Sequence, residues 1–253
     1  MIPRSLSTVC GRMAAPVGLA SRLLIETLLP AACPVCEEPL ADHRGGVCAR
    51  CWAEVVAIPS TLLPAQPRRA GPGRFLASLS TLGSYEGRLK AIIRCLKFGD
   101  LPEVGARLGA LMAPHLKNLP GGFDLVVPVP LHYRRRWRRG YNQAETIAAA
   151  LATASGRPMS RRALRRRRPT APQSGRSRRQ RVTNVSSAFA PGRRLLSPLE
   201  TRSLSGVTVL LVDDVVTTGA TMRECARVLK ACGAREVHAA AAARTLLHAH
   251  TLR

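Results

Sequence analysis

Two adjacent carboxylates, Asp213 and Asp214, stand directly before a short turn of threonines and glycine. The turn joins an apolar run to a segment with helical periodicity, so it should end a buried strand and begin a helix. Backbone N–H groups at a helix start, together with threonine hydroxyls, bind phosphate groups well. We therefore predict a phosphate cradle made by Thr217, Thr218, Gly219, Ala220 and Thr221.

The two carboxylates have a different expected role. They would repel a phosphate in the cradle, so they suit the hydroxyls of an attached sugar, or a Mg²⁺ ion that bridges sugar and phosphate. The turn lacks the Gly-Lys-Ser/Thr sequence of a Walker loop, which argues against a P-loop nucleotide site. The structural alternative is a polar turn whose threonines only cap the following helix.

Four cysteines form a second chemical group. Cys33 and Cys36 make one Cys-x-x-Cys pair, and Cys48 and Cys51 make another. Two such knuckles close a tetrahedral sulfur shell around Zn²⁺. Since four thiolates leave no open coordination position, we predict a structural zinc ion that takes no part in catalysis. A pair of redox dithiols or disulfides is the alternative, which a cytoplasmic location disfavours.

Basic residues strongly outnumber acidic ones: 39 Lys and Arg against 15 Asp and Glu give a formal net charge of +24. Such an excess favours an anionic partner, either small phosphates or nucleic acid. Only Lys90, Lys97, Lys117 and Lys230 are lysines, so the codon bias of a GC-rich genome explains part of the excess equally well. The positions of arginine clusters are therefore more informative than their number.

Arginines cluster in two segments. Residues 134–139 contain five arginines and follow a proline-fixed strand end, where backbone N–H groups can face an anion; a solvated basic helix start is the alternative. Residues 161–181 contain ten arginines, interrupted by Pro169 and Pro172. So many like charges should keep this second segment from packing stably by itself. Its alternative role is a contact strip for nucleic acid.

Apolar runs alternate with helical periodicity along most of the chain. We expect strands over residues 76–85, 124–130, 207–212 and 237–243, and helices over residues 89–96, 104–116, 144–151 and 219–232. The run at 207–212 is almost continuously apolar and β-branched, as in a central parallel strand covered on both faces. The alternation predicts an α/β fold with a mostly parallel sheet flanked by helices.

A stretch rich in proline and glycine, residues 59–73, is predicted to be a linker. It would separate an N-terminal domain (1–58), with a short amphipathic helix before the zinc ribbon, from the α/β domain (74–253). No run approaches the roughly 20 apolar residues of a membrane-spanning helix, so we expect no membrane insertion. Arg22 and Glu26 interrupt the apolar run near the N-terminus, which argues against a secretory signal and predicts a cytoplasmic location.

The segment around Asp213 resembles the ribose-phosphate motif of the type I phosphoribosyltransferases, and the whole chain resembles one branch of them, the ComF (competence protein F) family. The resemblance begins near Leu28 and rests on a set of motifs in a shared order. They are the four-cysteine ribbon, Leu96-Lys97-Phe98-Gly99-Asp100, Pro128-Val129-Pro130-Leu131, Arg139-Gly140-Tyr141-Asn142-Gln143-Ala144, and Gln173 followed by Arg181, Asn184 and Ala188-Phe189. It implies a type I phosphoribosyltransferase-like fold with a small N-terminal zinc ribbon.

The resemblance also implies a substrate and roles for the site residues. The substrate would be 5-phosphoribosyl-1-pyrophosphate, bound with Mg²⁺. Its 5-phosphate would lie on residues 217–221 and its ribose hydroxyls on Asp213 and Asp214. Its pyrophosphate would lie near the turn formed by Val129, Pro130, Leu131 and His132. We expect Asp213, Asp214 and Arg139 to be the catalytic residues, and residues 161–190 to form a mobile hood that closes over the site.

Three functions follow from these observations. The first is an enzyme that transfers phosphoribosyl to a nitrogen nucleophile with release of pyrophosphate. The second is a non-catalytic competence factor that uses the fold to bind nucleotide or single-stranded DNA, together with proteins of DNA uptake. The third is a zinc-ribbon interaction protein whose α/β domain is only structural. The intact pair of acids and the Thr217-Thr218-Gly219 turn favour ligand binding over the third; the acceptor and the oligomeric state are not predicted.

Overall fold

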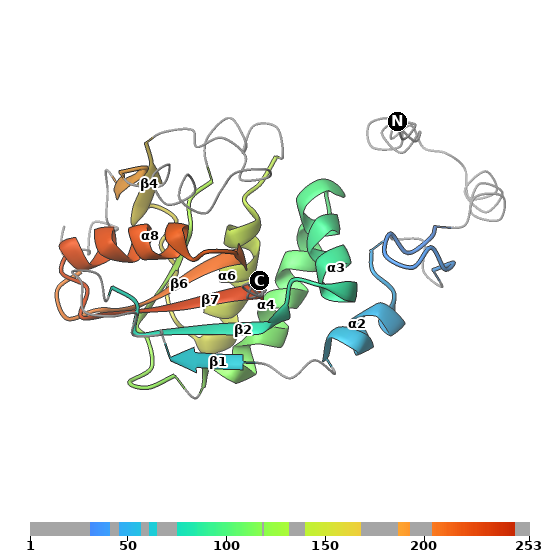
Figure 1. Cartoon of the computed structure of the whole chain (residues 1–253), viewed down its shortest axis with the longest axis horizontal. Helices are drawn as coiled ribbons and strands as arrows, with labels where there is room; N and C mark the ends of the chain where they lie inside the picture. Colours follow the sequence, from blue (N-terminus) through green and yellow to red (C-terminus); the bar gives the residue numbers. More distant parts are fainter. Residues whose placement is uncertain are drawn as a thin grey trace, which may run out of the picture.

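A five-stranded sheet forms the centre of the computed structural model, with the strand order β1-β2-β7-β6-β3 (Figure 1). The structure describes residues 31–40, 46–56, 61–64, 75–117, 119–131, 140–167, 187–192 and 204–245. The strands are β1 (Thr61–Pro64), β2 (Ser78–Ser84), β3 (Leu125–Pro128), β6 (Thr208–Val216) and β7 (Glu236–Arg244). β2, β7, β6 and β3 are mutually parallel, whereas β1 joins β2 in antiparallel register.

Helices cover both faces of this sheet, as the alternation in the sequence predicts (Figure 1). One face packs against three helices: α3 (Gly87–Phe98), α4 (Pro102–Leu116) and α6 (Gln143–Ser155). The other face packs against α8 (Ala220–Ala231) and a small antiparallel ribbon of β4 (Leu164–Arg166) and β5 (Phe189–Pro191). A further helix, α2 (Ala49–Val56), belongs to the cysteine region and lies against α3.

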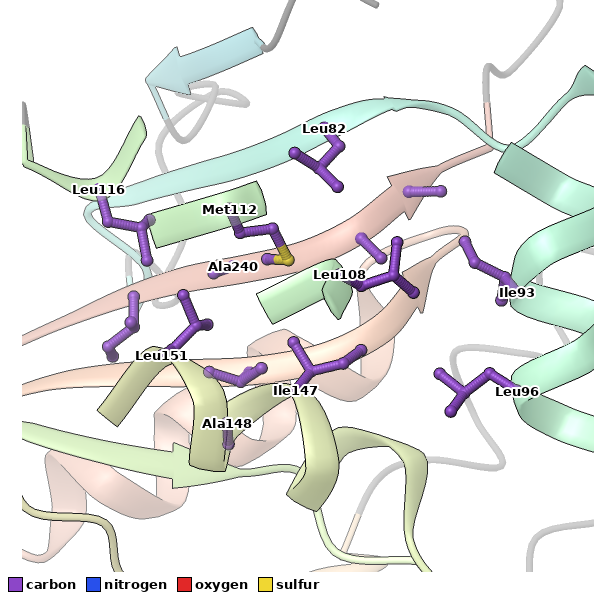
Figure 2. Close-up of a cluster of buried hydrophobic side chains, with 14 of the residues drawn as sticks. Leu82, Ile93, Leu96, Leu108, Met112, Leu116, Ile147, Ala148, Leu151 and Ala240 are labelled. Atoms are coloured by element: carbon purple, nitrogen blue, oxygen red, sulfur yellow. The ribbon is translucent and has the colours of Figure 1, made fainter. Parts of the chain in front are cut away.

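Alternating side chains of the central strands divide the apolar core into two layers. Leu210 and Ala240 point into the layer of α3, α4 and α6, and Figure 2 shows Met112 beside Ala240, with Leu108 and Ile147 in the same cluster. Leu211 and Ala239 point into the layer of α8. This period of two is the property of a strand buried on both faces. It confirms the expected central parallel strand at 207–212, which extends to Val216 in the structure.

The alanine-rich segment at 237–243, whose composition suits a helix or a strand, forms the central strand β7. It lies between β2 and β6 and pairs in parallel with both. Alanine by itself prefers a helix, but hydrogen bonds to strands on both sides make this segment a strand.

One prediction needs correction. Residues 61–64, inside the stretch predicted to be a linker, form β1 at the edge of the sheet. Thr61 lies opposite Thr81, and Pro64 lies opposite Ser78. An edge strand tolerates proline because only one side of its backbone joins the sheet. Proline therefore gives no reliable sign of a linker at this position.

Other predictions fall outside the described residues. These are the amphipathic helix before the zinc ribbon, the arginines of residues 134–139, and the middle of the predicted hood, residues 168–186. Within the part of the chain that the structure describes, no helix combines the length and the apolar character needed to cross a membrane.

The packing of α4 on α6 depends on a glycine. A Cβ atom added to Gly109 would stand 2.6 Å from the carbonyl oxygen of Ile147 and 2.7 Å from Cβ of Ala150. Backbone of the neighbouring helix cannot yield as a flexible side chain can, so the two helices would have to separate. Gly109 thereby fixes the distance of α6 from α4.

We expect Gly109→Ala to lower the free energy of unfolding by about 1–3 kcal/mol, the usual effect of overpacking in a core. Urea unfolding followed by circular dichroism measures it. Ala110→Leu adds more volume at the next, exposed position of α4 and should change stability by less than about 0.5 kcal/mol. Equal effects of the two substitutions would contradict the close packing.

Candidate functional site

The predicted site residues that the structure describes gather at the carboxyl ends of β3 and β6. These two strands are parallel neighbours, so their ends lie at the same edge of the sheet. The amide of Val129, just after β3, donates a 2.8 Å hydrogen bond to the carbonyl of Val212, just before the two acids. The sheet thus brings the 129–131 turn beside the acidic pair. Ligands of open parallel sheets bind at this edge.

The threonine-glycine turn has the strand–turn–helix geometry that its sequence predicts. β6 ends at Val216, and α8 begins after Gly219, whose φ of +70° is the left-handed conformation that favours glycine. The hydroxyl of Thr218 accepts a 3.4 Å hydrogen bond from the amide of Ala220. The first N–H groups of a helix have no acceptor within the helix, so this end of α8 suits an anion.

A guanidinium lies beside this turn. Nη1 of Arg223 stands 3.2 Å from the place that a Cβ atom on Gly219 would take. Arg223 belongs to the first turns of α8, and its amide donates a 2.9 Å hydrogen bond to the carbonyl of Gly219. The sequence analysis missed this cation. Its spacing of four residues from Gly219 at a helix start is the signal that places it there.

The acidic pair stands on the last part of β6, and its members differ in environment. The alternation of β6 turns Asp214 toward α3, where Oδ2 lies 3.2 Å from Nζ of Lys97. Asp213 turns to the side of α8, and its Oδ1 accepts a 2.9 Å hydrogen bond from the amide of Asp214. Both residues are partly buried.

The carboxyl group of Asp213 resists ionisation. Loss of hydration on burial, followed by repulsion from Asp214, raises its pKa to about 7. The hydrogen bond from the amide of Asp214 and the positive charges of Lys97 and Arg166 oppose this rise without cancelling it. A hydroxyl proton or a cation beside the pair would supply the stabilisation of the ionised form that burial removes.

Lys97 and Arg166 are site residues that the sequence analysis did not single out for this role. Nζ of Lys97 also lies 5.6 Å from the centre of the Tyr85 ring. The guanidinium of Arg166, at the base of the predicted hood, lies 5.3 Å from the centre of the Phe189 ring. The scarcity of lysine in a chain so rich in arginine is the signal that could have drawn attention to Lys97.

The turn after β3 is tied to the start of α6 by Asn142. Its Nδ2 donates a 3.0 Å hydrogen bond to the carbonyl of Val129, and its Oδ1 accepts a 3.2 Å hydrogen bond from the amide of Ala144. One buried side chain thus caps the helix and holds the strand end. Val129, Pro130 and Leu131 are placed at the site, whereas His132 and Arg139 lie outside the described residues.

The four paired cysteines come together in a separate cluster. Their sulfur atoms all lie within 4.8 Å of one another, and Cys33 and Cys51 are almost fully buried. The first knuckle is closed by two 2.8 Å hydrogen bonds, from the amide of Cys33 to the carbonyl of Glu38 and from the amide of Glu37 to the carbonyl of Cys33. The second knuckle ends in α2, which contains Cys51.

The surroundings of the four sulfur atoms fit a Zn²⁺ ion. Burial opposes ionisation of Cys33, but hydrogen bonds to its sulfur, first from the amide of Cys48, lower its pKa to about 6. Burial and the neighbouring thiols raise the pKa of Cys51. Four thiolates this close need a cation, and Arg50 and Arg88, which both interact with Cys36, balance the net negative charge of a four-thiolate zinc centre.

Comparison with known proteins agrees with both parts of the structure. Residues 98–247 match the family described as phosphoribosyl transferase domain, which confirms the predicted fold. Residues 24–62 match the double zinc ribbon domain, which supports a structural zinc at the four cysteines.

Three relatives share much of the chain. DNA utilization protein YhgH of Salmonella typhi is 34% identical, over 86% of this chain and 99% of its own. Competence protein F of Haemophilus influenzae is 30% identical, over 62% of this chain and 68% of its own. Competence protein ComFC of Bacillus subtilis is 27% identical, over 78% of this chain and 70% of its own.

Replacing Cys33 and Cys36 by serine should reduce bound zinc from about one equivalent to almost none, because two ligands cannot hold a structural zinc ion. The N-terminal region should become sensitive to protease at the same time. Elemental analysis of the purified protein measures the metal. Cys232→Ser, at a cysteine outside the cluster, should leave the zinc content unchanged. Purified wild-type protein without zinc would contradict the assignment.

Proposed function

The chain belongs to the ComF family of phosphoribosyltransferase-like proteins with an N-terminal zinc ribbon, and from this premise we propose that it binds 5-phosphoribosyl-1-pyrophosphate with Mg²⁺ and transfers the phosphoribosyl group to a nitrogen nucleophile. One observation carries the proposal. Asp213 and Asp214 lie near the end of the central parallel strand β6, which ends at Val216, and the left-handed Gly219 and the start of α8 follow within a few residues. The carboxyl groups that would bind the sugar and the N–H and hydroxyl groups that would bind its phosphate are thus close together in the chain.

Each part of the substrate has a matching group. The 5-phosphate would bind the hydroxyls and amides of residues 217–221, with Arg223 as an added positive charge. The ribose hydroxyls would donate hydrogen bonds to Asp213 and Asp214. The pyrophosphate would lie toward the turn at 129–132, whose backbone Asn142 holds in place. The distribution of negative, polar and positive groups follows the distribution of charge on the substrate.

The acidic pair also fits Mg²⁺, which prefers carboxylate and hydroxyl oxygen ligands. Burial and then repulsion from Asp214 raise the pKa of Asp213, and a divalent cation beside the pair would reduce both effects. When bound, Mg²⁺ supplies positive charge that neutralises the departing pyrophosphate.

The reaction is a displacement at the anomeric carbon of the ribose. The bond from this carbon to the pyrophosphate oxygen breaks, a bond to nitrogen forms, and the nitrogen loses a proton. Positive charge develops on the sugar ring, and the negative charge of the acidic pair would stabilise it. Arg139 and the arginines of the hood would stabilise the negative charge on pyrophosphate, and a closed hood would keep water from the reactive sugar.

A second candidate function is a non-catalytic role in the uptake or processing of DNA, with nucleotide or single-stranded DNA as ligand. Relatives of this chain are named DNA utilization protein and competence protein, and a net charge of +24 suits a polyanion. Binding of the sugar donor is compatible with this role. Release of pyrophosphate in the presence of bases and amines distinguishes the two, because only the enzyme produces it.

Replacing both Asp213 and Asp214 by asparagine should weaken binding of 5-phosphoribosyl-1-pyrophosphate and Mg²⁺ by at least about 100-fold, since each hydrogen bond to a charged group contributes about 1.5–3 kcal/mol. Isothermal titration calorimetry measures the affinity, and a thermal scan verifies that the fold persists. Glu103→Gln, which removes an exposed carboxylate from the first turn of α4, serves as the control and should bind normally. Unchanged affinity in the double variant would refute the ribose assignment.

If the arginines around β4 bind DNA, then Arg162→Glu with Arg167→Glu should reduce the salt dependence of single-stranded DNA binding. Each lost phosphate contact lowers the slope of log K against log salt by about 0.7, so the pair should lower it by more than about 1. Fluorescence anisotropy at several salt concentrations gives the slope. The control variant is Arg94→Glu with Arg157→Glu, which changes the net charge by the same amount at exposed positions away from β4. An equal slope in both variants would show that these arginines do not contact DNA.

A further inference from the structure

Helix α3 contacts the first zinc knuckle through two side chains. Nη1 of Arg88 donates a 3.4 Å hydrogen bond to the carbonyl of Val35, and the thiol of Cys95 donates a long, 3.9 Å contact to the carbonyl of Pro34. Pro34 and Val35 are the two residues between Cys33 and Cys36. The backbone that wraps the metal ligands is therefore held against α3.

The second knuckle adds further contacts to the same region. Nε of Arg88 lies 3.0 Å from Oε2 of Glu54 on α2. Trp52 of α2 is 2% exposed and packs in the core formed by α3 and α4, with the guanidinium of Arg107 4.7 Å from its ring centre. The zinc lobe (residues 31–56) and α3 thus share one packed interface, and Figure 1 shows α2 beside α3.

The last turn of α3 contacts the acidic pair. Lys97 reaches Asp214 at 3.2 Å, and the side chains of both are largely buried, at 18% and 15% exposure. The hydroxyl of Tyr141 donates a hydrogen bond to the carbonyl of Leu96, which fixes this end of the helix. The amide of Gly99 closes it by donating to the carbonyl of Cys95. Lys97 therefore extends from a helix end that is held on several sides.

The two sets of contacts lie on different sides of α3. Arg88 and Cys95 are seven residues apart, which puts them on the same side of a helix with 3.6 residues per turn. Lys97 follows Cys95 by two residues, a rotation of about 200°, and so points the other way. The helix is held between the metal knuckle on one side and the acidic pair on the other.

We propose that Lys97 is a positioning residue that holds Asp214 in the orientation in which the pair receives a sugar, and that the first zinc knuckle keeps Lys97 there through α3. The role of Lys97 toward a ligand rests on the proposed function. The role of Lys97 in holding Asp214 does not depend on the proposed function, because the ion pair between them forms without a ligand.

The ion pair has a measurable consequence for the neighbouring Asp213. Among the described residues, the groups that act on the carboxyl group of Asp213 are Asp214 on β6, Lys97 from α3, Arg166 from β4 and the thiol of Cys225 from α8. The positive charge of Lys97 lowers the pKa of Asp213, because it favours the ionised carboxylate. Without Lys97 the acidic pair should therefore take up its proton at a higher pH, and Asp214 should lose its fixed orientation.

The first experiment replaces Lys97 by methionine, which keeps the length of the side chain and removes its charge. In the full chain with zinc bound, carbon-13 NMR of the aspartate carboxyl groups should show Asp213 titrating at a higher pH than in the wild type. Affinity for 5-phosphoribosyl-1-pyrophosphate with Mg²⁺ at neutral pH should fall by about fivefold, because a smaller fraction of the acidic pair is fully ionised. Lys90→Met, at an exposed position of the same helix, should change neither quantity, and Lys97→Arg should restore most of both.

The outcomes separate this proposal from the proposed function. If wild-type protein binds the donor and Lys97→Met binds it equally, with an unchanged titration of Asp213, the role of Lys97 is refuted while the function stands. If the titration shifts but neither protein binds the donor, the proposed function fails and the role of Lys97 in holding the acidic pair stands.

The second experiment tests the zinc knuckle. Arg88→Ala removes the contacts with Val35 and Glu54 but no cysteine, so zinc should remain bound. We expect the titration of Asp213 to shift in the same direction as in Lys97→Met, by a smaller amount, because α3 loses a support and Lys97 its fixed place. Arg94→Ala, exposed on the same helix, is the matched control. A titration of Asp213 identical to that of wild type would refute the part assigned to the knuckle.

Discussion

Two adjacent carboxylates at the end of a buried strand are the constraint on which the rest of the structure depends. Two negative charges that are adjacent and partly buried are unfavourable unless other groups compensate them. The protein supplies the compensation from three directions: Lys97 from α3, Arg166 from β4, and the amide of Asp214 itself. Because this compensation is incomplete, the pKa of Asp213 stays raised, and a ligand that brings hydroxyl protons or a cation would complete the compensation.

The parallel sheet makes this arrangement possible. The alternation of β6 sends Asp213 and Asp214 to opposite faces, so Asp214 pairs with Lys97 of α3 while Asp213 also meets the positive charge of Arg166 on β4. The small alanines of β7 let that strand lie between β2 and β6 with helices packed closely over both faces. Because β3 is the other neighbour of β6, its end brings the 129–131 turn to the same edge. The site is thus a product of strand order as much as of the residues themselves.

The parts that the sequence could predict are those whose signals are local. The Cys-x-x-Cys pairs, the apolar strand before Asp213 and the glycine before α8 each show their structure within a few residues. Lys97 could not be assigned in this way, because its partner Asp214 is brought to it only by the packing of α3 on the sheet. The same holds for Arg166, which acts on Asp213 from a different strand. β1 was missed because Pro64 and the prolines around the strand resemble a linker, and only pairing with β2 reveals an edge strand.

A zinc ion closed by four thiolates has no open position for chemistry, so any influence on a distant site must be mechanical. Such an influence has three requirements. The metal must hold a small lobe in its folded form, a helix or strand must pack against that lobe, and this helix or strand must carry a residue of the site. The cysteine lobe is too small to have a substantial core of its own, and its buried residues Trp52 and Val55 instead join the core of α3 and α4. α3 is the element between the lobe and the acidic pair, because one side of it contacts the first knuckle through Arg88 and the other side carries Lys97. The metal and the acidic pair therefore share a support, although no atom connects them directly.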